Sequence, residues 1–399
     1  MVFYKLIKRI FLRGLYLFYC LRKFTAQEGE VEPTRIKKIL IVETAFLGDV
    51  VAVHPLIQET ARCFPEAHIC MVVQKQYGPL VKYAPCLSSC VTFEKSSFGE
   101  VLGCLVRLWG ARYDLVICAS PGVRNSLISL FAGRSLVTGY LVWLSSNTSY
   151  FQDHRIDSIG KRLGKSLLYR KEEHITVRGL KALLPLELGT RTVPTAPRLL
   201  LPGSVVRKEC LVLEQQGFIK KQQVNLVVHA GASVMLRQWP VEKMVELLIR
   251  LKARCDSELN VTLVGVPSEE VFLKRICRGL PYDINVFAGY DLTCVLVLIK
   301  TCDLFLGMDS GPKYIADGFS RPLVELLGPQ CPETVGALGN HVKTIFHDIG
   351  CNPCIQTECT REGECLREIT VDEVLENIIS LVDSLNQPHL SFTGYRLEA

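Results

Sequence analysis

The sequence predicts an α/β fold made of two doubly wound domains in tandem. Two observations support this: short apolar runs alternate with amphipathic segments, and the alternation is interrupted once, around residues 185–223. Buried β runs separated by helical segments are typical of parallel sheets with helices on both faces. We therefore expect two such domains facing a central cleft, with ligands bound beyond the carboxyl ends of the strands.

The first half of the chain contains three clear apolar runs and one long amphipathic segment. A Pro-, Gly- and Thr-rich stretch follows them and is typical of a linker. The predicted strands cover 38–43, 67–74 and 113–120, the predicted helix covers 50–64, and the linker covers 185–204.

The alternation restarts after this linker. The predicted strands cover 224–230, 260–266, 284–289, 303–310 and 322–328, with helices over 241–255, 269–280, 292–302 and 313–320. At 399 residues the chain is long enough for two or three domains. We expect an N-terminal helix over 1–30, a first Rossmann-like domain over 31–203, a second Rossmann-like domain over 204–385 and a tail over 386–399.

The N-terminal 30 residues are basic and apolar at once. They hold six Lys and Arg against two Glu, a net charge of +4, whereas the whole chain carries only +6. The remaining charge is too small to indicate nucleic-acid binding. No uncharged run there reaches the roughly 20 residues of a membrane span. The pattern favours an interfacial helix on anionic lipid, with a helix that caps the first domain as the alternative.

The chain has 17 cysteines, and many lie inside apolar runs. An odd total, with many cysteines inside apolar runs, favours reduced thiols in a cytoplasmic enzyme over a disulfide framework. The spacing CxxC-x4-C-x5-C could ligate zinc or an iron–sulfur cluster, or form a reduced structural loop, and the sequence leaves both open. Its residues are Cys351, Cys354, Cys359 and Cys365.

The second domain carries a candidate diphosphate site. The run LFLGM ends at Met308, and Asp309-Ser310-Gly311 then opens a predicted helix. Small residues there let the backbone approach a ligand, and the helix N-terminus favours an anion. The alternative is that Asp309 or Ser310 only caps the helix.

Two further strand ends in this domain carry charged residues. Arg237 precedes Trp-Pro, where it could neutralise phosphate charge, although it could also be a surface arginine. Glu269 follows a Gly-x-Pro turn, where it could accept hydrogen bonds from ribose hydroxyls or simply favour the helix start. Because the chain contains no D-x-D pair, we expect no bound metal; Arg237, the helix termini and Lys313 would neutralise the diphosphate.

Asp49 lies at the matching strand end of the first domain, in the stretch ETAFLGDVV. An acid disfavours phosphate binding at this position. A carboxylate can instead act as general base on an acceptor hydroxyl. The alternative is an aspartate that only caps the helix.

These motifs together resemble glycosyltransferase family 9, the ADP-heptose:lipopolysaccharide heptosyltransferases. The similarity runs from about Lys37 to about Val382 and is carried by ILIVETAFLGDVV, HAGAS…RQWP, GVPSEE, DSGPKYIADGFSRP and the CNPC loop. The resemblance implies a GT-B fold and an inverting, metal-independent displacement without a cofactor. In one departure, Tyr314 stands where the family usually has histidine.

The resemblance implies roles for individual residues. It assigns the catalytic base to Asp49 and donor binding to Arg237, Glu269, Asp309, Ser310 and Gly311. We also expect Lys313 to bind the donor, and Gly48 and Arg124 to bind the acceptor. Residues 31–203 would then form the acceptor-binding domain and residues 204–385 the nucleotide-sugar-binding domain. The expected partners are a nucleotide-diphosphate sugar, a lipid-linked core oligosaccharide and the inner face of the inner membrane. A sugar-nucleotide epimerase or hydrolase, and a non-catalytic binding protein, are the alternatives.

Overall fold

The computed structural model describes residues 32–140, 173–255, 259–352, 354 and 359–386. The chain forms two compact units, Met1–Arg198 and Leu199–Ala399, called unit 1 and unit 2 below. The predicted N-terminal helix over 1–30 lies outside the described residues, as does the tail from 387 onward. Within the described part, no helix is both long and apolar enough to cross a membrane.

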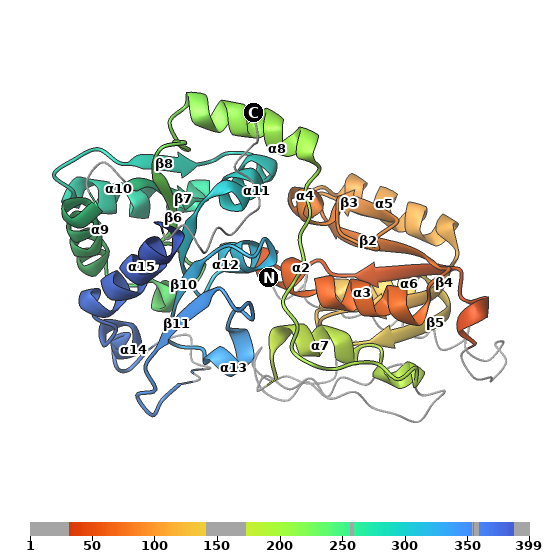
Figure 1. Ribbon diagram of the computed structural model, residues 1–399. Coiled ribbons are helices and arrows are strands. Elements are labelled where there is room, and N and C mark those ends of the chain that lie inside the picture. Colours follow the sequence, from red (N-terminus) through yellow and green to blue (C-terminus); the bar gives the residue numbers. More distant parts are fainter. Residues whose placement is uncertain (1–31, 141–172, 256–258, 353, 355–358, 387–399) are drawn as a thin grey trace. The chain divides into compact units, whose positions relative to one another are not determined.

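The described residues of unit 1 form a sheet with the strand order β3-β2-β1-β4-β5, in which every neighbouring pair is parallel. The order changes direction between β1 and β4, which is where ligands bind in doubly wound folds. The strands are β1 (Lys38–Val42), β2 (His68–Gln74), β3 (Ser89–Phe93), β4 (Tyr113–Cys118) and β5 (Gly133–Gly139), shown in Figure 1.

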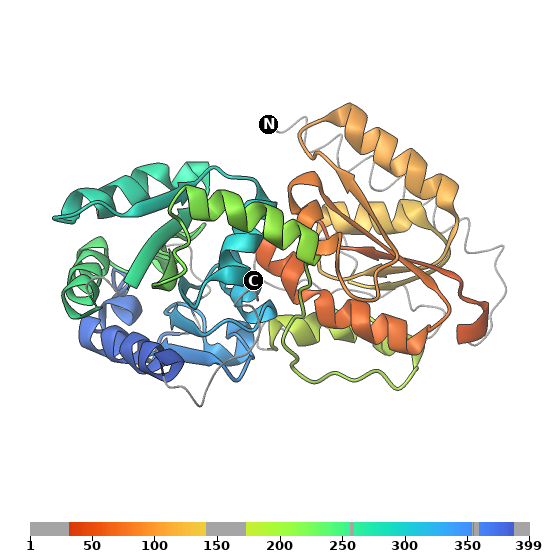
Figure 2. The same ribbon diagram turned by 45° about the horizontal axis from the view of Figure 1, so that its top comes forward.

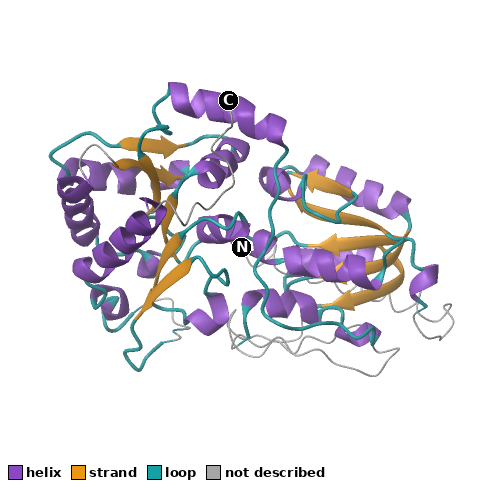
Figure 3. Cartoon of the chain, viewed as in Figure 1, coloured by secondary structure: helices purple, strands orange, loops and turns teal. Residues whose placement is uncertain are grey.

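Helices cover both faces of this sheet (Figure 3). Leu40 and Val42 of β1 belong to a core that includes Leu108 and Ile128 on two helices. Ile39 and Ile41 point to the opposite face and are also fully buried. The helices are α2 (Leu47–Ala52), α3 (His54–Cys63), α4 (Gly78–Val81), α5 (Phe98–Ala111), α6 (Val123–Ala132) and α7 (Ile175–Lys181).

The single helix expected over 50–64 is wrong, because α2 and α3 are separate helices that meet at Val53. Pro55 lies in the first turn of α3, where its missing N–H donor costs nothing. The same residue inside one long helix would leave a backbone carbonyl without its donor. The break leaves α2 as a short helix that carries Asp49 in its first turn.

Unit 2 contains a six-stranded sheet with the order β11-β10-β9-β6-β7-β8, again parallel throughout. Here the order changes direction between β6 and β9. The predicted α/β fold of two doubly wound domains is therefore confirmed. The strands are β6 (Val224–His229), β7 (Leu259–Gly265), β8 (Asn285–Ala288), β9 (Leu304–Met308), β10 (Leu323–Leu327) and β11 (Val342–Phe346).

The helices of unit 2 pack in groups around this sheet. The two views of Figures 1 and 2 show α9 beside α10 and α15, and α8 beside α11. One of them, α8, forms inside the stretch 185–223 that interrupts the sequence pattern. The helices are α8 (Gly203–Gln215), α9 (Val241–Cys255), α10 (Glu270–Gly279), α11 (Leu292–Thr301), α12 (Gly311–Gly318), α13 (Pro332–Val335), α14 (Glu364–Arg367) and α15 (Val371–Asn386).

Candidate active site

Asp49 is the third residue of α2, in the turn that follows β1. Its Oδ2 atom accepts a hydrogen bond from the backbone N–H of Phe46 at 3.1 Å. The capping role that the sequence left open is therefore present. It does not exclude a chemical role, because Asp49 is only partly buried at the carboxyl end of β1. Gly48 precedes it in the same helical turn and is also partly buried.

A second carboxylate, which the sequence analysis did not single out, lies beside this turn. Glu43 follows β1 directly and is 1% exposed. Its Oε1 atom accepts a hydrogen bond from the backbone N–H of Ala45 at 2.8 Å. Burial raises the pKa of Glu43 to about 7, and the negative charge of Asp49 contributes to the rise. An acid at the end of an otherwise apolar run is the sequence signal that could have identified it.

A buried polar network fixes the backbone between these two acids. The Asn125 side chain accepts from both the backbone N–H and the hydroxyl of Thr44, at 3.0 and 2.6 Å. Gln74 donates to the carbonyl oxygens of Thr44 and Ala45. Arg124 is exposed and its guanidinium lies 3.5 Å from the Thr44 carbonyl oxygen. Arg124 and Gly48 are therefore close to the Asp49 turn.

In unit 2, three side chains meet at the carboxyl ends of neighbouring strands. His229 ends β6, Ser310 follows β9, and Glu269 closes the 3-10 turn Pro267–Glu269 after β7. The Ser310 hydroxyl lies 3.0 Å from His229 Nδ1, and His229 Nε2 lies 3.4 Å from Glu269 Oε2. A proton on Nε2 would serve both contacts, since the imidazole would donate to Glu269 and accept from Ser310. His229 was not predicted from the sequence.

Two glycines make room for the Glu269 carboxylate. A Cβ atom at Gly231 would lie 2.2 Å from Glu269 Oε1, and one at Gly265 would lie 3.1 Å from Oε2. Burial alone would raise the pKa of Glu269, but the hydrogen bond and charge of His229 outweigh it, so the pKa is lowered. Glu269 is thus an ionised acceptor held between backbone and imidazole.

Asp309 lies between two cations. Arg237 NH1 is 3.1 Å from its Oδ2 atom and Lys313 Nζ is 3.4 Å from its Oδ1 atom. The Arg237 contact is close enough for an ion pair but lacks hydrogen-bond geometry, so buried Oδ2 has no hydrogen-bond donor. The Arg237 side chain keeps 32% of its surface exposed. Arg237 is therefore the more accessible of the two cations.

Lys313 is fully buried, which differs from the expectation that it presents its charge to a diphosphate. Its ammonium donates to Glu325 at 2.9 Å and to the Val335 carbonyl oxygen at 2.8 Å. Burial would lower the pKa of Lys313, but the charges of Glu325, Tyr314 and Asp309 raise it. A buried ion pair with these hydrogen bonds holds Lys313 inside unit 2.

Tyr314 contributes to the same buried cluster. Its hydroxyl donates to the Val335 carbonyl oxygen at 2.6 Å, the same atom that Lys313 contacts. Ser310 precedes α12 but makes no side-chain capping bond to it, because its hydroxyl is directed to His229 and the Met308 carbonyl. The N-terminus of α12, beginning at Gly311, is therefore left without a serine cap.

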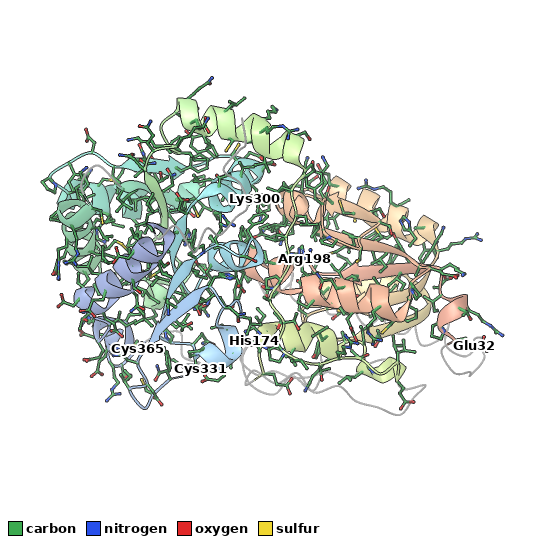
Figure 4. The ribbon with its side chains drawn as sticks, viewed as in Figure 1. Glu32, His174, Arg198, Lys300, Cys331 and Cys365 are labelled. Carbon is green, nitrogen blue, oxygen red and sulfur yellow. The ribbon has the colours of Figure 1, made fainter. Side chains whose placement is uncertain are left out.

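The four cysteines of the 351–365 loop line one small pocket in unit 2. Cys365, labelled in Figure 4, is buried, and burial with the charges of the other three thiols raises its pKa. Gln330 donates to the Cys354 carbonyl oxygen and ties the loop to the sheet end. In the part of the chain that is described, no group of three or more His, Cys, Asp or Glu residues could hold a metal ion.

Comparison with known proteins gives consistent matches. A model of glycosyltransferase family 9 (heptosyltransferase) matches residues 105–364. Lipopolysaccharide heptosyltransferase 1 of Pseudomonas aeruginosa is 23% identical over 341 residues, which cover 81% of this chain and 87% of that protein.

Solved structures agree with this match. A family 9 glycosyl transferase from Veillonella parvula has a TM-score of 0.70 at 18% identity, covering 90% of this chain and 99% of that chain. The E. coli ADP-heptose lipopolysaccharide heptosyltransferase II has a TM-score of 0.68 at 23% identity, covering 88% and 100%. Together with the two parallel sheets, these likenesses confirm the predicted GT-B type of fold.

Proposed function

This chain belongs to glycosyltransferase family 9, the heptosyltransferase family, and we propose that it transfers a heptose from ADP-heptose to a lipopolysaccharide core acceptor. The related proteins of P. aeruginosa and E. coli, named for this activity, support the choice of substrates. The observation that carries the proposal is the meeting of His229, Glu269 and Ser310 at three neighbouring strand ends of unit 2.

In this proposal the donor binds to unit 2. The ionised Glu269 accepts from ribose hydroxyls, and the N-terminus of α12 receives the diphosphate at Ser310 and Gly311. Arg237 leaves Asp309 to neutralise the charge that develops on the diphosphate, which its partly exposed side chain and imperfect pairing allow. Lys313 acts through Asp309 as a positioning residue, because its own ammonium is held by Glu325. No metal is required for this charge balance.

In unit 1, Asp49 acts as the general base. It removes the proton of an acceptor hydroxyl while that oxygen forms a bond to the anomeric carbon and the bond to the diphosphate breaks. This single displacement inverts the anomeric centre. Gly48 and Arg124, which lie near the Asp49 turn, would contact the acceptor. Residues 1–30, with their net charge of +4, would bind the anionic inner face of the inner membrane.

Replacing Asp49 by Asn tests the central assignment. We expect transfer of heptose to heptose-deficient lipopolysaccharide to fall at least about 100-fold, because general-base catalysis contributes that much or more. ADP binding, measured by calorimetry, should stay unchanged. A matched control is Asp114→Asn, since Asp114 also accepts backbone amides, from Lys37 and Lys38, but lies at the start of β4.

Two outcomes would contradict the proposal. Full transfer activity in Asp49→Asn would remove the base assignment. Turnover of ADP-heptose at the same rate with no acceptor present would instead indicate a sugar-nucleotide epimerase or hydrolase.

A further inference from the structure

The turn between β1 and α2 is held by two carboxylates, one on each side. The backbone N–H of Ala45 donates to Glu43 at 2.8 Å, and the next N–H along the chain, that of Phe46, donates to Asp49 at 3.1 Å. Consecutive amides therefore orient both acids toward the same short stretch of backbone. This geometry keeps two carboxyl groups near each other, and their repulsion costs free energy when both are ionised.

Glu43 is firmly fixed and shielded from water. It is 1% exposed and lies where the strand order reverses, between β1 and β4. The Asn125 amide lies 3.5 Å from its Oε1 atom, and Ser120, which follows β4, also forms a hydrogen bond to it. Such a side chain cannot reach an acceptor sugar by itself, so any effect it has on the reaction passes through Asp49.

Other titratable and charged groups lie near the two acids. Cys118 of β4 faces Glu43, and burial raises the pKa of that thiol to about 12, so it stays neutral. Tyr77 lies near Asp49, and burial raises its pKa as well. Arg124 of α6 is directed to the Thr44 carbonyl oxygen. The charge that acts on Glu43 is that of Asp49 itself.

We propose that Glu43 is a positioning residue that sets the proton affinity of Asp49. When Glu43 is ionised, its charge makes Asp49 a stronger base, because the repulsion between two carboxylates is relieved when Asp49 takes up a proton. That proton comes from the acceptor hydroxyl, whose oxygen bonds to the sugar as the diphosphate leaves; Glu43 itself forms and breaks no bond to substrate. The inference rests on the proposed role of Asp49 as base.

The proposal gives the reaction a characteristic pH dependence. The pKa of Glu43 is raised to about 7 by burial and by Asp49. Below that pH Glu43 is neutral and Asp49 is the weaker base; above it Glu43 is ionised and the rate should rise. We expect a rise of roughly three- to tenfold across pH 6–8, since strongly interacting carboxylates shift each other by about one pK unit or more and rates follow basicity.

The test compares wild type with Glu43→Gln, which keeps an oxygen for the Ala45 amide but removes the charge. The ratio of wild-type to variant kcat should be near one at pH 6 and reach roughly three- to tenfold at pH 8. The donor KM should not change. Glu43→Asp, which restores the charge, should recover the pH-dependent rise. A ratio that is constant over pH, or equal rates at pH 8, would overturn the proposal.

A measurement on the wild type covers the case in which the variant fails to fold. With ¹³C-labelled aspartate side chains, the Asp49 carboxyl signal, assigned by its loss in Asp49→Asn, should show a second inflection where Glu43 titrates. A single inflection would contradict the coupling. The two hypotheses can be rejected separately. Activity in Asp49→Asn would reject the assignment of Asp49 as base. An inactive Asp49→Asn, together with a pH–rate profile of Glu43→Gln that equals that of the wild type, would reject only the role of Glu43.

Discussion

The Asp49 turn of unit 1 and the Glu269 turn of unit 2 use the same backbone device. Each acid is the third residue of a helical segment after a strand, and each accepts from the amide three residues earlier, Phe46 at 3.1 Å and Val266 at 3.0 Å. Their neighbours differ. Asp49 lies near another carboxylate, Glu43, whereas the partner of Glu269 is His229.

One local motif can therefore serve two kinds of chemistry. An adjacent carboxylate raises proton affinity, which suits an acid that must take up a proton. An adjacent imidazole lowers it, which suits an acid that must stay ionised and accept hydrogen bonds. The pKa of Glu269 is indeed lowered by His229, against the effect of its own burial. The neighbour, rather than the turn, separates the two roles.

Among the tests of this difference between the two turns, we expect the largest effect from Glu269→Ala, on ADP binding. We predict that the Kd for ADP rises roughly 10- to 100-fold, because hydrogen bonds to charged groups contribute about 1.5–3 kcal/mol. Calorimetric titration measures this. The matched control is Glu270→Ala, one residue along, whose side chain is exposed and paired with Lys274. Equal affinities for wild type and Glu269→Ala would show that Glu269 does not bind the donor.

A second prediction concerns Glu43 in unit 1 and the pH dependence of the free energy of unfolding. The pKa of Glu43 in the folded chain is about 7, above its ordinary value of 4.5. Between pH 4.5 and pH 7, Glu43 is therefore protonated in the folded chain and ionised in the unfolded chain. The free energy of unfolding should therefore fall as pH rises from 4.5 to 7, by up to about 1.4 kcal/mol per pH unit.

Denaturant unfolding of wild type and Glu43→Gln measures this contribution. The difference in unfolding free energy between the two proteins should change across pH 4.5–7 and stay level outside that window. His54 contributes with the opposite sign, since burial lowers its pKa to about 4, but both proteins contain it and it cancels. Parallel pH curves would show that the Glu43 proton is not linked to folding.

The smallest effect is expected from Gly231→Ala. The added methyl would lie 2.2 Å from Glu269 Oε1, the end of a flexible side chain, so the carboxylate should swing away at little cost in stability. ADP affinity should then fall about tenfold, less than in Glu269→Ala. Gly103→Ala on α5, where a Cβ meets nothing within 4 Å, is the control. Unchanged ADP affinity in Gly231→Ala would contradict the proposal that the space beside Gly231 holds Glu269 in position to bind the donor.

The sequence alone determined the two doubly wound domains and the strand ends at which charged residues lie. The apolar runs at 38–43 and 303–310 are local patterns, and the acids that follow or end them, Asp49 and Asp309, can be read directly. The break between α2 and α3 was not predicted, although Pro55, which cannot donate within a helix, was a local signal for it. These features depend on residues within one or two turns of each other.

Only the tertiary structure decided which side chains meet. Ser310 contacts His229, 81 residues away in sequence, because β9 pairs with β6. Lys313 is buried because Glu325 projects from the neighbouring β10. Strand order and packing are set by the whole core, so burial and charge pairing do not follow from local pattern. The same reason hid Glu43, whose carboxyl matters only through its long-range neighbours and its loss of water.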